Sequence, residues 1–243
     1  MSNTPFQFSG KLYLIPTTLG TSNPIEVLPL SIKKIIEKID DYIVENEKTA
    51  RKSIKDVVPS KKQPLLKLNL LNKFTDPASL SSFLDPCKEG LDVGLLSEAG
   101  CPGVADPGAE IVKLAHQMGI QVVPLVGPSS ILLAMMGSGM NGQSFTFHGY
   151  LPIDKKERKN ELKNLERISS ERNQAQIFIE TPYRNNKLLE DMTQQLHSAT
   201  RLCVACDITL PSEYIITKSI SDWGKTKVDL HKRPTIFIIQ KEL

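Results

Sequence analysis

Long apolar runs are missing from this chain of 243 residues, which excludes a membrane-spanning helix. A span needs roughly 18 or more consecutive apolar residues, and no stretch approaches that length. Residues 1–10 also lack the basic start and apolar centre of a secretory signal peptide. We therefore expect a cytoplasmic protein with no membrane partner.

Cysteine and histidine are scarce, with four of each, and their spacing indicates no metal site. Cys203 and Cys206 have the spacing of a zinc motif. They lie, however, in an apolar strand pattern in which residues three apart face opposite sides, and no second Cys/His pair matches them. The sequence therefore predicts no metal ion, and reduced thiols suit the cytoplasm.

The chain also has little excess of one charge over the other and few aromatic residues. Thirty basic against 27 acidic side chains leave a net charge of +3, and aromatic residues make up 6% of the chain. This surplus is too small to indicate a nucleic-acid partner by itself. No run of aromatics accompanies basic groups such as Lys61-Lys62 or Lys232-Arg233, so the sequence gives base stacking little support.

The glycine fingerprint of a dinucleotide site is absent, because Gly20 stands alone after the first predicted strand. Apolar strands and helices instead alternate over residues 1–142, which predicts an N-terminal α/β domain with a mostly parallel sheet covered on both faces. Segment 59–76 has little pattern, and we interpret it as a surface excursion rather than a mobile flap. The expected strands are 12–15, 42–45, 92–96 and 122–126, and the expected helices are 31–39, 48–57, 77–89, 109–118 and 131–137.

Residues 143–243 form a second predicted domain, entered around Phe145–Pro152. Asp154 has the side chain and position of an N-cap for a charged helix over residues 155–170. The apolar patterns that follow predict strands over residues 176–180, 202–207, 214–219 and 235–240.

The loop after the strand 92–96 is the candidate active site. Between Ser97 and Gly108 it holds three glycines and two prolines. Ligand crevices in open α/β sheets lie beyond the carboxyl ends of the strands, where glycine lets the backbone approach a ligand. Two further strand ends carry similar loops, Pro16–Gly20 and Gly127–Ser130, and the second enters a helix whose first N–H groups suit an anion. We therefore predict that the three loops together line one crevice.

These motifs resemble the tetrapyrrole methylase superfamily, and most closely its branch that methylates a ribose 2′-hydroxyl of small-subunit ribosomal RNA. The likeness runs from Leu12 to about Gln240 and rests on Ser97–Gly108, Gly127–Ser130 and Phe147–Pro152. It implies a two-domain α/β fold with a mostly parallel N-terminal sheet, a mixed C-terminal sheet and S-adenosylmethionine in the cleft between the domains. The cofactor-binding positions that it implies are Pro16, Glu98, Ala99, Gly100, Cys101, Val104, Ser129, Ser130, Glu180 and Thr181.

The same resemblance implies a homodimer, and the apolar surface of Ile131–Met136 exceeds what one buried helix needs. It also aligns Glu45 and Arg51 with an acidic-then-basic motif of the RNA branch. A ribose hydroxyl is a weak acid that profits from a general base. Glu45 is thus the candidate base and Arg51 the candidate phosphate ligand.

The chain departs from the pattern of that branch at several positions, so the acceptor stays open. RNA is the preferred acceptor. The alternatives are a tetrapyrrole or another small molecule, or a cofactor-binding module without catalysis. The departures are Asn46 for aspartate, Lys48 for arginine, Glu98 for aspartate, and Leu70–Lys73 in place of a His/Glu/His/Asn-like segment.

Overall fold

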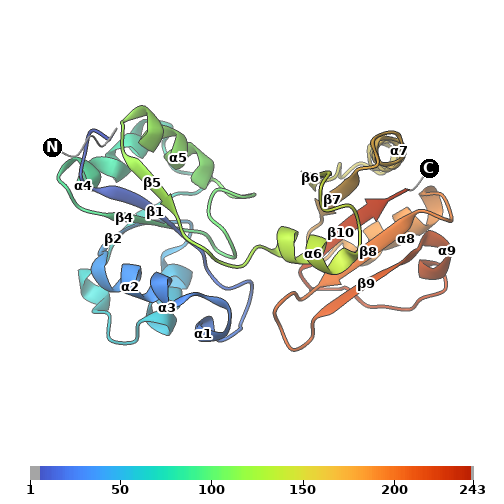
Figure 1. Ribbon diagram of the computed structural model, residues 1–243, viewed down its shortest axis with the longest axis horizontal. Coiled ribbons are helices and arrows are strands. Elements are labelled where there is room, and N and C mark those ends of the chain that lie inside the picture. Colours follow the sequence, from blue (N-terminus) through green and yellow to red (C-terminus); the bar gives the residue numbers. More distant parts are fainter. Residues whose placement is uncertain (1–5, 242–243) are drawn as a thin grey trace. The chain divides into compact units, whose positions relative to one another are not determined.

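The computed structural model describes residues 6–241 and divides the chain into two compact units, Met1–Ser129 and Ser130–Leu243 (Figure 1). The sequence predicts the boundary between residues 142 and 143. The division lies earlier because helix α6 (Ser130–Ser138) packs on strands β8, β9 and β10 of the second unit. Within residues 6–241, no helix combines the length and apolar character needed to cross a membrane.

The first unit is built on a five-stranded sheet with the order β3-β2-β4-β1-β5, and all of its strand pairs are parallel. Its central strands β2 and β4 are buried throughout, as expected for a sheet covered on both faces. This confirms the mostly parallel N-terminal sheet. The strands are β1 (Lys11–Ile15), β2 (Asp41–Val44), β3 (Lys67–Leu70), β4 (Val93–Leu96) and β5 (Gln121–Pro124).

The interpretation of segment 59–76 as a surface excursion missed strand β3, although most residues of this segment are exposed or half-buried. The strand pairs with β2, with Leu68 opposite Tyr42. Because β3 is an edge strand, none of its residues is fully buried, and Lys67 and Leu70 are exposed. A short strand of this kind has no apolar run to distinguish it from a loop.

Helices cover both faces of the first sheet, and each face has its own hydrophobic core (Figure 1). Tyr42 belongs to one core and its neighbour Ile43 to the other, as the alternation along a strand requires. The predicted helix 77–89 is a 3₁₀ segment (Pro77–Leu84) followed by the short α4 (Asp85–Lys88), because Pro86 has no N–H for an α-helical hydrogen bond. The other helical segments are α1 (Pro24–Val27), α2 (Leu30–Lys38), α3 (Glu47–Val57), a 3₁₀ turn (Gln63–Leu65) and α5 (Gly108–Gln117).

The second unit is built on a mixed five-stranded sheet with the order β6-β7-β10-β8-β9, in which only the β6–β7 pair is parallel. This confirms the mixed C-terminal sheet. Asp154 caps α7 as predicted, because its side chain accepts the N–H groups of Lys156 and Glu157. The elements are β6 (Phe145–Tyr150), α7 (Lys155–Arg172), β7 (Ala175–Ile179), α8 (Asn185–Gln195), β8 (Arg201–Cys206), β9 (Tyr214–Ser219), α9 (Ile220–Trp223) and β10 (Thr235–Gln240).

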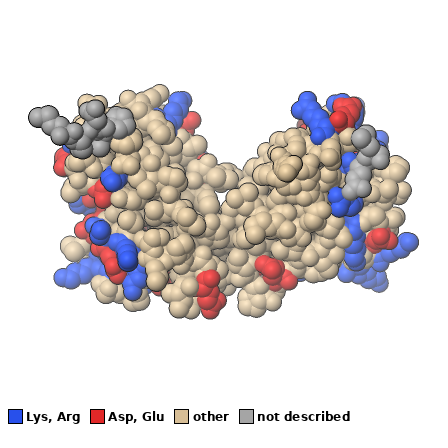
Figure 2. All heavy atoms as spheres, in the orientation of Figure 1, with Lys and Arg blue, Asp and Glu red and all other residues tan. Residues whose placement is uncertain are grey.

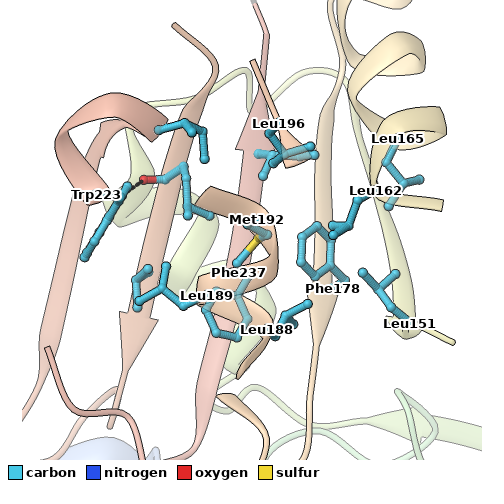
Figure 3. Packing of buried hydrophobic residues seen from close by; sticks show 14 of the residues in the cluster. Leu151, Leu162, Leu165, Phe178, Leu188, Leu189, Met192, Leu196, Trp223 and Phe237 are labelled. Atoms are coloured by element: carbon cyan, nitrogen blue, oxygen red, sulfur yellow. Dashed lines mark hydrogen bonds between the residues drawn. The ribbon is translucent and has the colours of Figure 1, made fainter. Parts of the chain in front are cut away.

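The core of the second unit packs α7, α8 and α9 on one face of this sheet (Figure 3). The rings of Phe178 and Phe237 stack with their centroids 6.2 Å apart. Trp223 is buried and donates its indole N–H to the carbonyl of Leu202 at 2.8 Å, which satisfies its polar atom inside the core.

Candidate active site

The carboxyl ends of β1, β2 and β4 lie side by side because these strands are parallel neighbours. The loops that follow β1 and β4 are joined by hydrogen bonds. Thr17 donates its backbone N–H to the carbonyl of Gly100 at 3.0 Å and its hydroxyl to the carbonyl of Ser97 at 3.2 Å. Two of the three loops singled out in the sequence therefore form one connected surface.

The third loop packs directly on the first. A side chain at Gly127 would place its Cβ 2.2 Å from Cβ of Pro16, so only glycine fits there. The thiol of Cys101 lies 3.3 Å from the carbonyl oxygen of Pro128, and burial raises its pKa. The structure thus brings together Pro16, Gly100, Cys101 and the loop up to Ser129 within the first unit. Ser130 is the first residue of α6 and belongs to the second unit.

The loop after β4 has an unusual backbone that Asp106 stabilises. Gly100 and Gly103 have φ values of 78° and 80°, which favour glycine. One carboxylate oxygen of Asp106 accepts the N–H groups of Gly103 and Gly108 at 2.7 and 2.8 Å. Burial raises the pKa of Asp106, and these two hydrogen bonds act in the opposite direction. Sequence reasoning missed Asp106, although an aspartate two residues before a helix-opening glycine is a recognisable turn signal.

A pocket of about 270 Å³ lies against this surface. Its walls are the loop after β1, one side of α3 from Thr49 to Asp56 and the start of the loop after β4. Of the predicted cofactor residues, Glu98 and Ala99 line it, while Val104 is exposed farther along the loop. Lys52 and Asp56 of α3 supply charges at the wall.

Glu45 follows β2 and is held by the neighbouring loop. Its carboxylate accepts the backbone N–H of Glu98 at 3.4 Å, and the Glu98 side chain accepts the hydroxyl of Thr49 at 2.6 Å. Burial raises the pKa of Glu45, the bond from Glu98 lowers it, and the charges of Asp106 and Glu98 raise it further. The raised pKa favours Glu45 as a general base, and this role stays a prediction.

Arg51 is tied to other groups than Glu45. Its guanidinium contacts the carboxylate of Glu47 at 2.8 Å and the carbonyl of Gln63 at 2.7 Å. The adjacent Lys52 is the basic residue that lines the pocket. The role of Arg51 as a phosphate ligand stays a prediction.

Glu180 and Thr181 follow β7 in the second unit. The Glu180 side chain is only 2% exposed and accepts two hydrogen bonds, from the N–H of Thr181 and from Arg184, both at 2.6 Å. These bonds stabilise the turn between β7 and α8. The predicted contacts of Glu180 and Thr181 with a cofactor stay a prediction.

Possible metal ligands are not clustered in the described part of the chain, and basic side chains do not form one continuous patch on the face drawn in Figure 2. Among residues 6–241, no group of three or more His, Cys, Asp or Glu side chains is arranged to hold a metal ion. Cys203 and Cys206 are buried in β8. On the face drawn in Figure 2, lysines and arginines form separate groups with acidic side chains among them.

Residues 28–223 match the family model described as Tetrapyrrole (Corrin/Porphyrin) Methylases. A protein of Bacillus subtilis named Ribosomal RNA small subunit methyltransferase I is 32% identical over 227 residues, which cover 91% of this chain and 73% of that protein. The protein of the same name from Vibrio cholerae is 30% identical over 204 residues, covering 84% of this chain and 67% of the relative.

Solved structures share the fold at lower identity. The methyltransferase CobJ matches with a TM-score of 0.62 and 17% identity, covering 96% of this chain and 94% of that one. A uroporphyrin-III C-methyl transferase from Thermus thermophilus, complexed with S-adenyl homocysteine, matches with a TM-score of 0.57 and 15% identity over 96% and 98% of the two chains. At these identities the likeness establishes the fold.

Proposed function

Because the chain belongs to the tetrapyrrole methylase family, whose members are S-adenosylmethionine-dependent methyltransferases, we propose that it methylates a ribose 2′-hydroxyl of small-subunit ribosomal RNA. The observation that carries this proposal is the identity of about 30% to proteins named for that RNA, over 84% and 91% of the chain. The half-buried carboxylate of Glu45 supports it, because a weakly acidic hydroxyl profits from a base. Such an acceptor agrees with a cytoplasmic location.

The loop after β4 fits the cofactor. Ala99 lines the pocket with no more than a methyl group, and Gly100 has the positive φ that lets the backbone turn there. Backbone groups of Ala99–Val104 would hold the polar parts of the cofactor. When bound, the cofactor supplies a methyl group on a positively charged sulfur, which moves by in-line displacement.

The residues of the chain then have to orient the acceptor and take its proton. As the ribose oxygen gains the methyl group, the carboxylate of Glu45 would accept the proton that this hydroxyl loses. Lys52, which lines the pocket, and Arg51 beside it on α3 would attract a phosphate of the acceptor. None of these tasks requires a metal ion.

Replacing Ala99 with valine should weaken binding of S-adenosylmethionine by roughly ten-fold or more, because the added methyl groups fill space beside the loop. Isothermal titration calorimetry on the parent should give one site per chain. Ala78→Val, at an exposed position in the 3₁₀ segment, is the matched control and should leave affinity unchanged. If Ala99→Val binds as tightly as the parent at an unchanged melting temperature, the cofactor lies elsewhere.

A methyl-transfer assay tests the acceptor. RNA from cells that lack this protein should accept tritiated methyl groups, and the label should remain in fragments that resist alkaline cleavage, because a 2′-O-methyl group blocks that cleavage. Small-molecule fractions of the same lysate compete in the assay. Label that enters those fractions would favour a small-molecule acceptor, and cofactor binding without any transfer would favour a silent module.

We further propose a homodimer that pairs through α6, in which Met136 is 79% exposed and Leu132 is also exposed. Exposed apolar side chains one helical turn apart are typical of an interface. Light scattering at micromolar concentration should give the mass of two chains, and Met136→Glu should give the mass of one. A monomeric parent would contradict the proposal.

A further inference from the structure

Three aromatic residues from distant segments lie at one end of the second sheet, the end at which β6 and β7 finish and β10 begins. Tyr150 ends β6, Tyr183 lies in the turn after β7, and His231 precedes β10. The pairings place these points together, because Tyr150 lies opposite Ile179 at the end of β7, and Ile179 also pairs with Ile236 at the start of β10. Tyr150 is 62% and Tyr183 69% exposed. We call these three residues the aromatic edge.

Two segments of the aromatic edge are fastened to each other. The rings of Tyr183 and His231 meet edge to face with centroids 5.7 Å apart. The N–H of Lys232 donates to the carbonyl of Pro182 at 3.0 Å, and Lys232 adopts a φ of 60°, which costs energy for a residue with a side chain. The strained backbone of Lys232 and its hydrogen bond to Pro182 therefore hold a turn in which Tyr183 is exposed to solvent.

A basic residue follows two of these rings in the sequence, Arg184 after Tyr183 and Lys232 after His231. Lys232 is exposed, and the side chain of Arg184 is 39% exposed. Arg184 bonds to Glu180 through one terminal nitrogen, while its Nε has no hydrogen-bond partner. The pKa of Arg184 is raised mainly by that bond to Glu180, which keeps the guanidinium charged.

We propose that the aromatic edge binds an unpaired nucleotide of the RNA acceptor, with the base stacked on Tyr183 and the adjoining phosphate held by Lys232 and Arg184. This inference rests on the proposed function and adds a recognition site to it. Exposed aromatic rings combined with cations are the means by which proteins hold single-stranded nucleic acid. A base inside a duplex has both faces covered and offers nothing to stack.

Binding of a labelled single-stranded oligocytidine to the full-length chain tests the stacking. Tyr183→Ala should weaken binding by roughly ten-fold, because one base–aromatic stack is lost, whereas Tyr183→Phe should bind like the parent. Phe145→Ala removes a ring at the start of β6, the opposite edge of the same sheet, and should have no effect. A hairpin duplex of alternating cytidine and guanosine should bind equally to parent and Tyr183→Ala.

The phosphate contact has its own measurement. Lys232→Gln should reduce the slope of log affinity against log salt by about 0.7, the share of one phosphate on a single strand. Lys225→Gln, an exposed lysine after α9, is the control. In turnover assays, Tyr183→Ala should raise KM for RNA, with kcat and cofactor affinity unchanged.

The outcomes separate this inference from the proposed function. A parent that methylates RNA while Tyr183→Ala binds single strands equally well overturns the aromatic edge alone. Loss in Tyr183→Phe equal to that in Tyr183→Ala also overturns stacking, because the ring is kept there. A parent that neither binds nor methylates RNA overturns the proposed function itself.

Discussion

Glu45→Gln is expected to lower the turnover of RNA methylation by about 100-fold or more while leaving cofactor affinity unchanged. General-base catalysis contributes 10² to 10⁴ in rate, and glutamine keeps the size of the side chain but cannot take a proton. Single-turnover methyl transfer with saturating RNA measures the effect. Glu47→Gln is the matched control, because Glu47 is an exposed carboxylate only two residues away that binds Arg51.

The pH dependence gives a second readout of the same residue. Burial raises the pKa of Glu45, so its carboxylate forms at a higher pH than that of an ordinary glutamate. Since the base acts when ionised, the rate should rise with pH through this pKa and then level off. The rising limb should be absent in Glu45→Gln. A variant with parental turnover would make Glu45 a strand-end carboxylate that only holds the N–H of Glu98.

Asp191→Ala is expected to destabilise the second unit by about 3–5 kcal/mol, the range for removing one partner of a buried ion pair. Arg158 of α7 bonds to Asp191 of α8 through Nε and Nη2 at 2.9 and 2.7 Å, and the two side chains are 9% and 7% exposed. The arginine also donates to the carbonyl of Ile153, which fastens the start of α7. Without Asp191 a buried guanidinium loses its counter-charge.

Urea denaturation followed by far-UV circular dichroism measures this loss. The control is Glu171→Ala, which breaks the exposed Arg167–Glu171 pair on α7 and should change the free energy of unfolding by less than about 1 kcal/mol. Replacing Arg158 and Asp191 together with methionine and leucine should recover much of the stability, because no unpaired charge is left buried. Equal effects of Asp191→Ala and Glu171→Ala would contradict a buried role for the pair.

The order of most strands and helices follows from the sequence because apolar periodicity reports which face of an element is buried. Strands 214–219 and 235–240 have the predicted bounds. The same rule fails at β3, an edge strand without buried residues. It also fails at 77–89, where the position of Pro86 decides between one helix and two short ones.

The candidate site was predictable in part for a related reason. Glycine and proline loops after parallel strands must meet at the carboxyl edge, and the bond from Thr17 to Gly100 and the close contact of Gly127 with Pro16 show that they do. The partners of single side chains were not predictable. Arg51 is spaced like a phosphate ligand, yet it is bound by Glu47 and the carbonyl of Gln63, which only the packing of α3 reveals.

The sequence by itself determined the α/β alternation, the loop composition at the strand ends and the family, because these depend on local pattern and on long specific motifs. Tertiary structure decided in which unit α6 packs and which charged side chains pair with each other. It also gathered Tyr150, Tyr183 and His231 at one edge, although the chain contains no aromatic run. The physical reason is that sheet pairing joins residues 29 to 63 positions apart, and no local pattern records such contacts.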